Sequence, residues 1–349
     1  MLAIVGPVFG HDALTRSDGV TVSGPGVQAI EHAGGWSLAQ LGDGDGRAFP
    51  ALVSHDRILD LSQREELRRP NDTLALLERW DDTLPVLCGI ASSGGEWEHL
   101  AEFRVSSPVA PRQIFQAGAN YRTHVLDLAA AHHDGSDGRT REQARADAAA
   151  RMDERLASSP FVFQGLPSAI CGAYDDVILP KDGTQPDWEL ELAAVIGRRA
   201  RRVPVENALQ VVAGWTIAND LTLRDKVFRK DSAALGADWL GSKNSPTFLP
   251  TGPVLVPREA LADPGDLRIT LRLNGAVMQD EPTKDMIFDV ARLISYSSQV
   301  ATLLPGDLVL TGSPAGNGLA HGRLLRAGDV MDSTITGLGS QMNRCVDER

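Results

Sequence analysis

The sequence predicts an α+β protein, rich in β-strand, in which a small N-terminal α+β domain precedes a larger β-rich domain. From residue 114 onward, short β-prone runs are separated by Gly and Pro, as β-rich folds require. Before residue 108, apolar residues recur first with strand spacing and then with helical spacing. The segment 106–111, Ser-Ser-Pro-Val-Ala-Pro, is typical of a linker. These observations place the two domains at residues 1–108 and 109–349.

The N-terminal domain is expected to contain a β-hairpin, a third short strand and two helices. A Gly/Asp-rich turn at 42–46 separates two strand-like runs, and Leu, Val and Ile then recur with helical spacing. The expected strands are 36–41, 51–54 and 57–61, and the expected helices are 73–80 and 84–91.

The larger domain is expected to consist of short strands with a few helices between them. Its apolar runs are rich in Val, Ile and Leu and are bounded by turn residues. The expected strands are 176–179, 190–196, 211–217, 267–273 and 308–310, and the expected helices are 205–211 and 285–303.

Residues 129–159 differ from the rest of this domain because Ala, Arg, Asp and Glu predominate. A break at 135–138 precedes the stretch 141–157, which has strong helix propensity and opposite charges at helical spacing. One interpretation is a solvated surface helix. The other is a helical lid, because the segment follows closely on His124, a candidate catalytic residue. Both interpretations can hold together.

Composition limits the classes of partner. The net charge of −12 over 349 residues argues against nucleic acid and anionic membrane surfaces, which both need a basic footprint. An anionic substrate must therefore be attracted by local cations.

The three cysteines, Cys88, Cys171 and Cys345, fit no zinc pattern and are expected to be thiols in a reducing compartment. Since neither a signal peptide nor an apolar run of ~18 residues is found, we expect a cytoplasmic protein.

Three carboxylates indicate a divalent-metal site. Glu189 and Glu191 are separated by one residue in an apolar, β-prone run, so on a strand they share a face. Two like charges on a buried face need neutralisation. Asp220, at the end of a second apolar run, can supply a third oxygen ligand; such a set suits Mg²⁺ or Mn²⁺, with Ca²⁺ a further candidate, better than zinc. The alternative is a solvent-facing edge strand with Asp220 in a turn, and spacing alone does not decide.

Beside the carboxylates, a series of short motifs extends over residues 112–342. The motifs are 118–124 (Gly-Ala-Asn-Tyr-Arg-Thr-His), 219–225 (Asn-Asp-Leu-Thr-Leu-Arg-Asp), Lys243, 250–253, 274–275, Gln279, 286–288, 305–307 and 311–316 (Thr-Gly-Ser-Pro-Ala-Gly). Taken in this order, they resemble the fumarylacetoacetate hydrolase family. The resemblance implies a mixed β-roll or β-sandwich with the metal at its open end, an accessory N-terminal domain and, usually, a homodimer.

The resemblance assigns three catalytic residues. His124 is the candidate base, since a neutral imidazole can take a proton from water when a carboxylate orients it. The family places a Glu three residues after this His, whereas this chain has Asp127, which is shorter by one methylene. Lys243 matches a family lysine near the substrate, where an ammonium stabilises an oxyanion or enolate.

The resemblance also suggests residues that contact the substrate, and two of these positions differ from the family pattern. Tyr121 and Arg224 either contact substrate or are buried structural partners, while the hydroxyls of Thr311 and Ser313 can donate to a ligand carboxylate. Gly312 and Gly316 would let the backbone approach that carboxylate. Two substrate-reading positions depart from the family pattern: Gln164 stands where a Lys is common, and Val227 where a Gln is common. These departures predict a less polar pocket and a divergent substrate.

The first functional hypothesis is a metal-dependent hydrolase that cleaves a C–C bond in a 1,3-dicarbonyl acid of the acylpyruvate or fumarylacetoacetate type. The metal would stabilise the enolate that develops as the bond breaks. The second is a 2-oxo acid decarboxylase or a dienol–keto isomerase, which needs the same enolate. The third is a metal-stabilised binding or structural protein without catalysis. In the first two, the partner is a small-molecule oxo acid.

Overall fold

The structure is a computed structural model that describes residues 29–349 except 94, 132–137 and 156–157. Residues 1–28 of the expected N-terminal domain, residues 135–137 of the expected break and residues 156–157 of the expected helical stretch lie outside the described residues. Within them, the α+β, β-rich fold class is confirmed. Among the residues that the structure describes, every helix is too short or too polar to traverse a bilayer.

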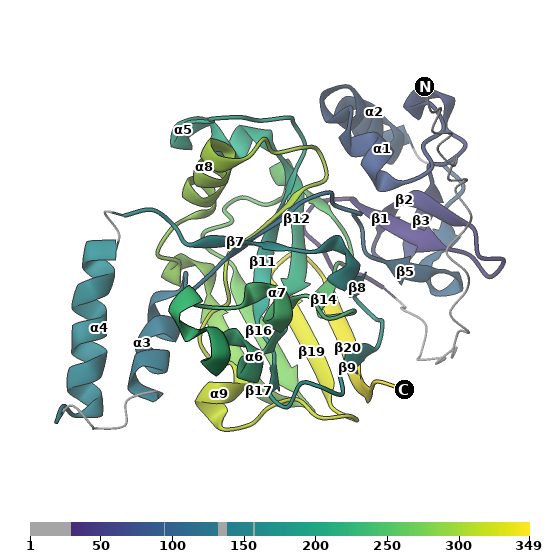
Figure 1. The fold of residues 1–349 in the computed structure, drawn as a ribbon. Helices are drawn as coiled ribbons and strands as arrows, with labels where there is room; N and C mark the ends of the chain where they lie inside the picture. Colours follow the sequence, from purple (N-terminus) through teal and green to yellow (C-terminus); the bar gives the residue numbers. More distant parts are fainter. Residues whose placement is uncertain (1–28, 94, 132–137, 156–157) are drawn as a thin grey trace, which may run out of the picture.

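The N-terminal sheet is built from residues 37–106 and has the strand order β4-β3-β2-β1-β5. Its first two strands form the expected antiparallel hairpin, and the next strand and both expected helices are also present. This sheet lies beside the larger one (Figure 1). Hydrogen bonds between the backbones of Leu38 and Leu255, at 2.9 and 2.8 Å, join the two. The elements are β1 (Ser37–Gly42), β2 (Ala48–Ser54), β3 (Arg57–Asp60), α1 (Thr73–Leu77), α2 (Trp80–Ser93), β4 (Glu98–His99) and β5 (Arg104–Ser106).

The largest sheet places the strand that carries Glu191 in its interior. The strand order is β7-β6-β18-β11-β12-β14-β8, so β11 has neighbours on both sides and all of its residues are buried. The members are β6 (Ile114–Ala117), β7 (Val162–Gly165), β8 (Ile170–Gly172), β11 (Leu190–Ile196), β12 (Val212–Asn219), β14 (Leu249–Thr251) and β18 (Leu308–Leu310), with β15 (Val256–Pro257) also paired to β12.

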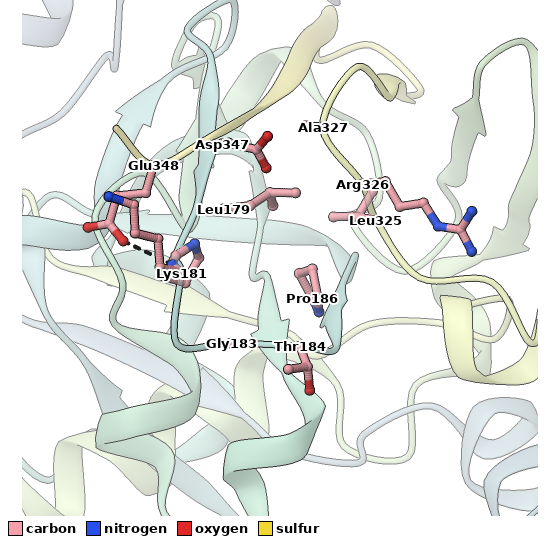
Figure 2. Close-up of a pocket in the computed structure, with 11 residues that line it drawn as sticks. Leu179, Lys181, Gly183, Thr184, Pro186, Leu325, Arg326, Ala327, Asp347 and Glu348 are labelled. Carbon is pink, nitrogen blue, oxygen red and sulfur yellow. Dashed lines mark hydrogen bonds between the residues drawn. The ribbon is translucent and has the colours of Figure 1, made fainter.

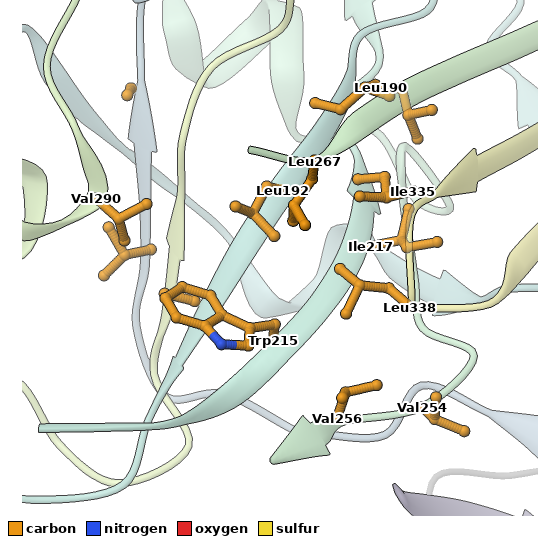
Figure 3. Packing of buried hydrophobic residues seen from close by; sticks show 14 of the residues in the cluster. Leu190, Leu192, Trp215, Ile217, Val254, Val256, Leu267, Val290, Ile335 and Leu338 are labelled. Atoms are coloured by element: carbon orange, nitrogen blue, oxygen red, sulfur yellow. The ribbon is translucent and has the colours of Figure 1, made fainter. Parts of the chain in front are cut away.

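Another five-stranded sheet, in the order β17-β16-β19-β20-β9, covers one face of the largest sheet (Figure 1). Side chains from β11 and β12, such as Leu192, Trp215 and Ile217, meet Ile335 and Leu338 in a continuous apolar core (Figure 3). This core fixes the strand ends where the carboxylates lie. The remaining strands are β9 (Val177–Leu179), β10 (Pro186–Asp187), β13 (Thr222–Leu223), β16 (Arg268–Leu273), β17 (Ala276–Pro282), β19 (Val330–Ile335) and β20 (Ser340–Asp347).

The helices of the larger part include the expected polar helix. α4 covers Arg141–Arg155, and it packs beside α3 at the edge of the molecule (Figure 1). Ala144, Ala148 and Met152 are buried at a spacing of four, which gives this charged helix a narrow apolar stripe. The other helices are α3 (Arg122–Ala131), α5 (Val205–Ala208), α6 (Arg224–Val227), α7 (Trp239–Lys243), α8 (Val290–Val300) and α9 (Gly318–His321).

The helix expected at 285–303 is shorter than predicted, because α8 begins only at Val290. Asp289 caps it by accepting a hydrogen bond from the Arg292 N–H at 2.8 Å. The residues before the cap are held by a distant partner: the N–H of Ile287 donates to the Asn120 carbonyl at 2.7 Å. Local periodicity carries no information about that contact.

Candidate metal centre

The antiparallel pairing of β11 and β12 brings the three carboxylates together. Leu190 pairs with Asn219, which sets Glu189 opposite Asp220, and the Asp220 N–H donates to the Glu189 carbonyl at 2.8 Å. Glu191 lies two residues further along, on the same face. One oxygen from each carboxylate lies within 4.8 Å of the others, and all three residues are buried. A solvent-facing edge strand is therefore the wrong alternative.

The chemistry of this donor set fits a divalent cation. Burial raises the pKa of Glu191 well above its ordinary value, and the neighbouring Asp220 raises it further. Burial likewise raises the pKa of Asp220 to about 6, although Lys243 opposes the shift. Burial also acts to raise the pKa of Glu189, but Arg224 and Lys243 outweigh it and lower that pKa, so Glu189 stays ionised. One ionised carboxylate beside two that resist ionisation is an arrangement that a hard cation with oxygen ligands stabilises. Glu189, Glu191 and Asp220 would hold Mg²⁺, Mn²⁺ or Ca²⁺ and leave positions for substrate.

Lys243, at the end of α7, contacts the carboxylates directly. Its buried Nζ donates to Glu189 Oε2 at 2.5 Å, and to Asp220 Oδ2 and the Asp220 carbonyl at 2.7 Å each. Burial alone would lower the pKa of Lys243, but Asp220, Glu189 and Glu191 outweigh it and raise the pKa. The ammonium therefore stays charged beside the carboxylates and offsets part of their repulsion.

Arg224 is a buried partner of the same carboxylates. Its Nε donates to Asp187 Oδ2 at 2.8 Å, and its guanidinium also pairs with Glu189. Asp187 is fixed in turn by the N–H groups of Trp188, at 2.9 Å, and Gly318, at 2.6 Å. Of the two roles expected for Arg224, the geometry favours the structural one, because the guanidinium orients Glu189.

Gln116 is a site residue that the sequence reasoning missed. It is buried on β6, and its Nε2 donates to Asp220 Oδ1 at 2.6 Å. The only local signal is a polar side chain inside the apolar run of β6. β6 lies next to β18, and β18 next to β11, so Gln116 reaches Asp220 through pairings that are remote in sequence. Such hydrogen bonds to a ligating carboxylate orient it.

His124 lies in the first turn of α3 and is buried beside the carboxylates. Burial lowers the pKa of His124 to about 4; Glu189 and Asp127 oppose this shift, while Arg224 and Lys243 reinforce it. The imidazole is therefore neutral at pH 7 and can accept a proton. Asp127 lies one turn further along α3, where its carboxylate forms an ion pair with Arg145 of α4. That His124 and Asp127 act together remains a prediction.

The hydroxyls expected to read the substrate are held by protein partners. Thr311 Oγ1 donates to the Leu192 carbonyl at 3.0 Å, and Ser313 Oγ accepts from Gln279 Nε2 at 3.0 Å. Tyr121 is fully buried, and burial raises the pKa of its phenol above the ordinary value, so it remains a donor. Thr311 and Ser313 keep acceptor capacity, and their contact with substrate stays a prediction.

The two glycines of the 311–316 segment are required by the protein's own backbone packing, and their approach to a ligand carboxylate stays a prediction. Gly312, at φ +87°, donates its N–H to Glu191 Oε2 at 2.7 Å, and an added Cβ would lie 2.9 Å from Asn120 Cβ. At Gly316, φ is +96° and an added Cβ would lie 2.1 Å from the Met278 carbonyl oxygen. Both positions require glycine for backbone packing, and Gly312 also fixes Glu191.

The structure does not bring Gln164 to the carboxylates. In the β6–β7 register Gln164 lies opposite Phe115, whereas Phe163 lies opposite Gln116. Since cross-strand neighbours share a face, Phe163 faces the site and Gln164, which is exposed, faces away. Gly165 shares the face of Phe163, and an added Cβ there would lie 2.7 Å from Gln116 Oε1. Gln116 therefore fills the space that a side chain at position 165 would need.

An open cavity of about 480 Å³ lies elsewhere, between the 179–186 loop, residues 325–327 and the C-terminal end of β20 (Figure 2). Its described lining residues include Lys181, whose N–H donates to Glu348 Oε2 at 2.9 Å, and none of the three carboxylates. This cavity is therefore distinct from the candidate metal centre.

The family is decided by a match that spans two thirds of the chain. Residues 113–346 match the model of the fumarylacetoacetate (FAA) hydrolase C-terminal domain. The chain belongs to the fumarylacetoacetate hydrolase family. It is 39% identical over 292 residues to the mitochondrial oxaloacetate tautomerase FAHD2A of Bos taurus, covering 83% of this chain and 84% of that one. It is also 41% identical over 197 residues to the 2,4-didehydro-3-deoxy-L-rhamnonate hydrolase of Sphingomonas sp. (strain SKA58), covering 56% and 67%.

Solved structures support the same assignment. The fumarylacetoacetate hydrolase from Exiguobacterium antarcticum aligns with a TM-score of 0.68 and 28% identity over 90% of this chain and 100% of that one. The maleylpyruvate hydrolase from Sphingobium sp. SYK-6, solved with manganese(II) and pyruvate, aligns with a TM-score of 0.66 and 25% identity over 90% and 100%. A divalent metal thus occurs in a related structure, in agreement with the donor set found here.

Proposed function

We propose that this family member is a divalent-metal-dependent enzyme that hydrolyses a C–C bond in an acylpyruvate-type acid. The observation that supports this most strongly is the buried set of Glu189, Glu191 and Asp220 with a neutral His124 beside it. Glu189, Glu191 and Asp220 would hold Mg²⁺ or Mn²⁺, which would supply Lewis acidity that stabilises negative charge on the substrate. The residence of this ion at these three carboxylates is part of the proposal.

The protein's own residues have three roles in this proposal: a base, a fixed positive charge, and groups that hold the carboxylates in place. His124 accepts a proton from water, because its low pKa keeps Nδ1 and Nε2 from being protonated together at pH 7. Lys243 provides a fixed positive charge against the carboxylates and against negative charge that develops on the substrate. Gln116, Arg224 and Gly312 hold Asp220, Glu189 and Glu191 respectively in place.

Enol–keto tautomerisation is a second candidate, and one contact favours it. Asp127, the carboxylate that would orient His124 for water activation, forms an ion pair with Arg145. Proton transfer to or from a substrate carbon needs His124 but no activated water. The bovine relative is an oxaloacetate tautomerase, which agrees with this alternative.

One experiment separates the two reactions. Acetylpyruvate and oxaloacetate are incubated with the enzyme in D₂O, with and without Mn²⁺, and products are followed by NMR. Hydrolysis gives Mn²⁺-dependent acetate and pyruvate from acetylpyruvate, and Asp127→Ala lowers the rate at least tenfold. Tautomerisation gives faster deuterium exchange at C3 of oxaloacetate without cleavage, and Asp127→Ala changes little. Cleavage of oxaloacetate to pyruvate and CO₂ above the rate with free Mn²⁺ would instead identify a decarboxylase.

Two further expectations accompany this proposal. The homodimer is testable by light scattering of the purified protein. The cytoplasmic location is testable by fractionation of the source cells, and it contrasts with the mitochondrial location in the name of the bovine relative.

A further inference from the structure

Three aromatic side chains, from β7, from the residue just before β7 and from α7, form a cluster next to the candidate metal centre. The rings of Phe163 and Trp239 stack with centroids 4.6 Å apart and planes 15° apart. Phe161 packs on both, at 6.2 Å from Phe163 and 6.1 Å from Trp239. We call these three residues the aromatic wall.

The inner end of the aromatic wall reaches the carboxylates. Phe163 shares its face of the sheet with Gln116, which donates to Asp220. The ring centroid of Phe163 lies 5.9 Å from Lys243 Nζ, and that Nζ contacts Glu189 and Asp220. A substrate held by the carboxylate site thus has Phe163 as a near neighbour.

The outer end of the aromatic wall faces solvent. Phe161 is 49% exposed, and Leu240, next to Trp239 on α7, is 68% exposed. Phe161 also lies over Gly118, where an added Cβ would be only 2.7 Å from its ring. The aromatic wall therefore links the neighbourhood of Lys243, through Phe163, to a solvent-exposed ring at Phe161.

No cation on these two elements is available to a second substrate carboxylate. Along the described strand β7, the positions that face the site are Phe163 and Gly165, and both are uncharged. On α7 the cationic side chain is Lys243, which is already bound to Glu189 and Asp220. Arg229, beside the start of α7, is paired with Asp231 and Asp238. A negatively charged distal arm packed on β7 and α7 would lose hydration without gaining an unpaired cation from either element, whereas an apolar arm gains from burial.

We infer that the preferred substrate is an acylpyruvate whose acyl group is apolar and bulky, with an aryl group packed against Phe163 and Trp239. This inference rests on the proposed function. In the reaction, water adds to the acyl carbonyl carbon and the bond from that carbon to the CH₂ group breaks. The electron pair of the broken bond passes to the pyruvate fragment, which takes up a proton. An aryl carboxylate and pyruvate result, with release of one proton overall and no oxidant or reductant.

The test compares kcat/KM for benzoylpyruvate, acetylpyruvate and oxaloacetate with the Mn²⁺-loaded enzyme. Benzoylpyruvate is expected to exceed both others by at least about tenfold. In Phe163→Ala the ratio of benzoylpyruvate to acetylpyruvate should fall at least about fivefold, and Phe163→Leu should restore part of it. Phe228→Ala, which removes a ring that is 74% exposed and outside the aromatic wall, is the matched control and should leave the ratio unchanged.

Equal or higher kcat/KM for acetylpyruvate or oxaloacetate would overturn the inference, as would an equal loss for all three substrates in Phe163→Ala. If none of the three is turned over, the proposed function fails, and calorimetric binding to the Mn²⁺-loaded protein still tests the aromatic wall. Benzoylpyruvate must then bind at least about tenfold more tightly than oxaloacetate, and equal binding would refute the inference.

Discussion

Substituting Gly165 by Ala should damage the metal centre from a distance, through Gln116. An added Cβ would lie 2.7 Å from Gln116 Oε1 and 2.9 Å from Gln116 Cδ, closer than real Cβ contacts allow. The Gln116 amide must therefore move, although a 2.6 Å hydrogen bond ties it to Asp220. Losing a buried hydrogen bond to a charged group costs about 1.5–3 kcal/mol, and comparable losses around a metal reduce its affinity about 10–100-fold.

A double-mutant cycle distinguishes this mechanism from general damage. Gln116→Ala should weaken Mn²⁺ binding by a similar factor, because Asp220 loses the same donor. The double variant should be little worse than either single one, because without the amide the new methyl group has room; the coupling should be about 1–2 kcal/mol. Mn²⁺ affinity is measured by isothermal titration calorimetry, and stability by urea unfolding.

The matched control is Gly89→Ala, which places a methyl group within α2 where nothing lies within 4 Å. It should leave Mn²⁺ affinity unchanged and stabilise the helix slightly. Strictly additive losses in the cycle, or wild-type Mn²⁺ affinity in Gly165→Ala, would refute the reasoning.

Two further predictions concern buried charges. Burial lowers the pKa of His124 to about 4 in the folded protein, whereas in the unfolded chain it is about 6.5. As pH falls below about 6.5, His124 is therefore protonated in the unfolded chain but not in the folded protein, and the free energy of unfolding decreases. Between pH 7.5 and pH 5 wild type should lose about 2 kcal/mol more than His124→Asn in urea unfolding; parallel losses would contradict this. Lys243→Met should cost about 3–5 kcal/mol of unfolding free energy, since Glu189 and Asp220 lose their buried ammonium, and saturating Mn²⁺ should restore part of it. A loss below about 1 kcal/mol, measured by the same unfolding assay, would show that the contact is not structural.

The carboxylate site could be predicted because its signal is local. Alternation places Glu189 and Glu191 on one face of a strand, and Asp220 follows the next strand, which pairs with the first. The polar helix at 141–155 could be predicted for the same reason, since helix propensity and charge spacing are properties of one segment.

The supporting contacts could not be predicted because they join distant segments. Gln116 reaches Asp220 across 104 positions, and Asn120 fixes Phe288 across 168. The prediction for Gln164 depended on which alternate residues of β7 point toward the site. A shift by one residue along a strand turns every side chain to the other face of the sheet. In the structure, Phe163 and Gly165 are the residues of β7 that lie on the same face of the sheet as Gln116 and the site.

The central claim is that Glu189, Glu191 and Asp220 hold a divalent metal on which activity depends. The most direct measurement is turnover of benzoylpyruvate, acetylpyruvate and oxaloacetate by wild type and Glu191→Ala, in chelator-treated buffer and after addition of Mn²⁺. We predict that chelation abolishes wild-type activity, that Mn²⁺ restores it with one ion bound per chain, and that Glu191→Ala stays inactive. Full wild-type activity in chelator-treated buffer, or an Mn²⁺ response in Glu191→Ala equal to that of wild type, would contradict the claim.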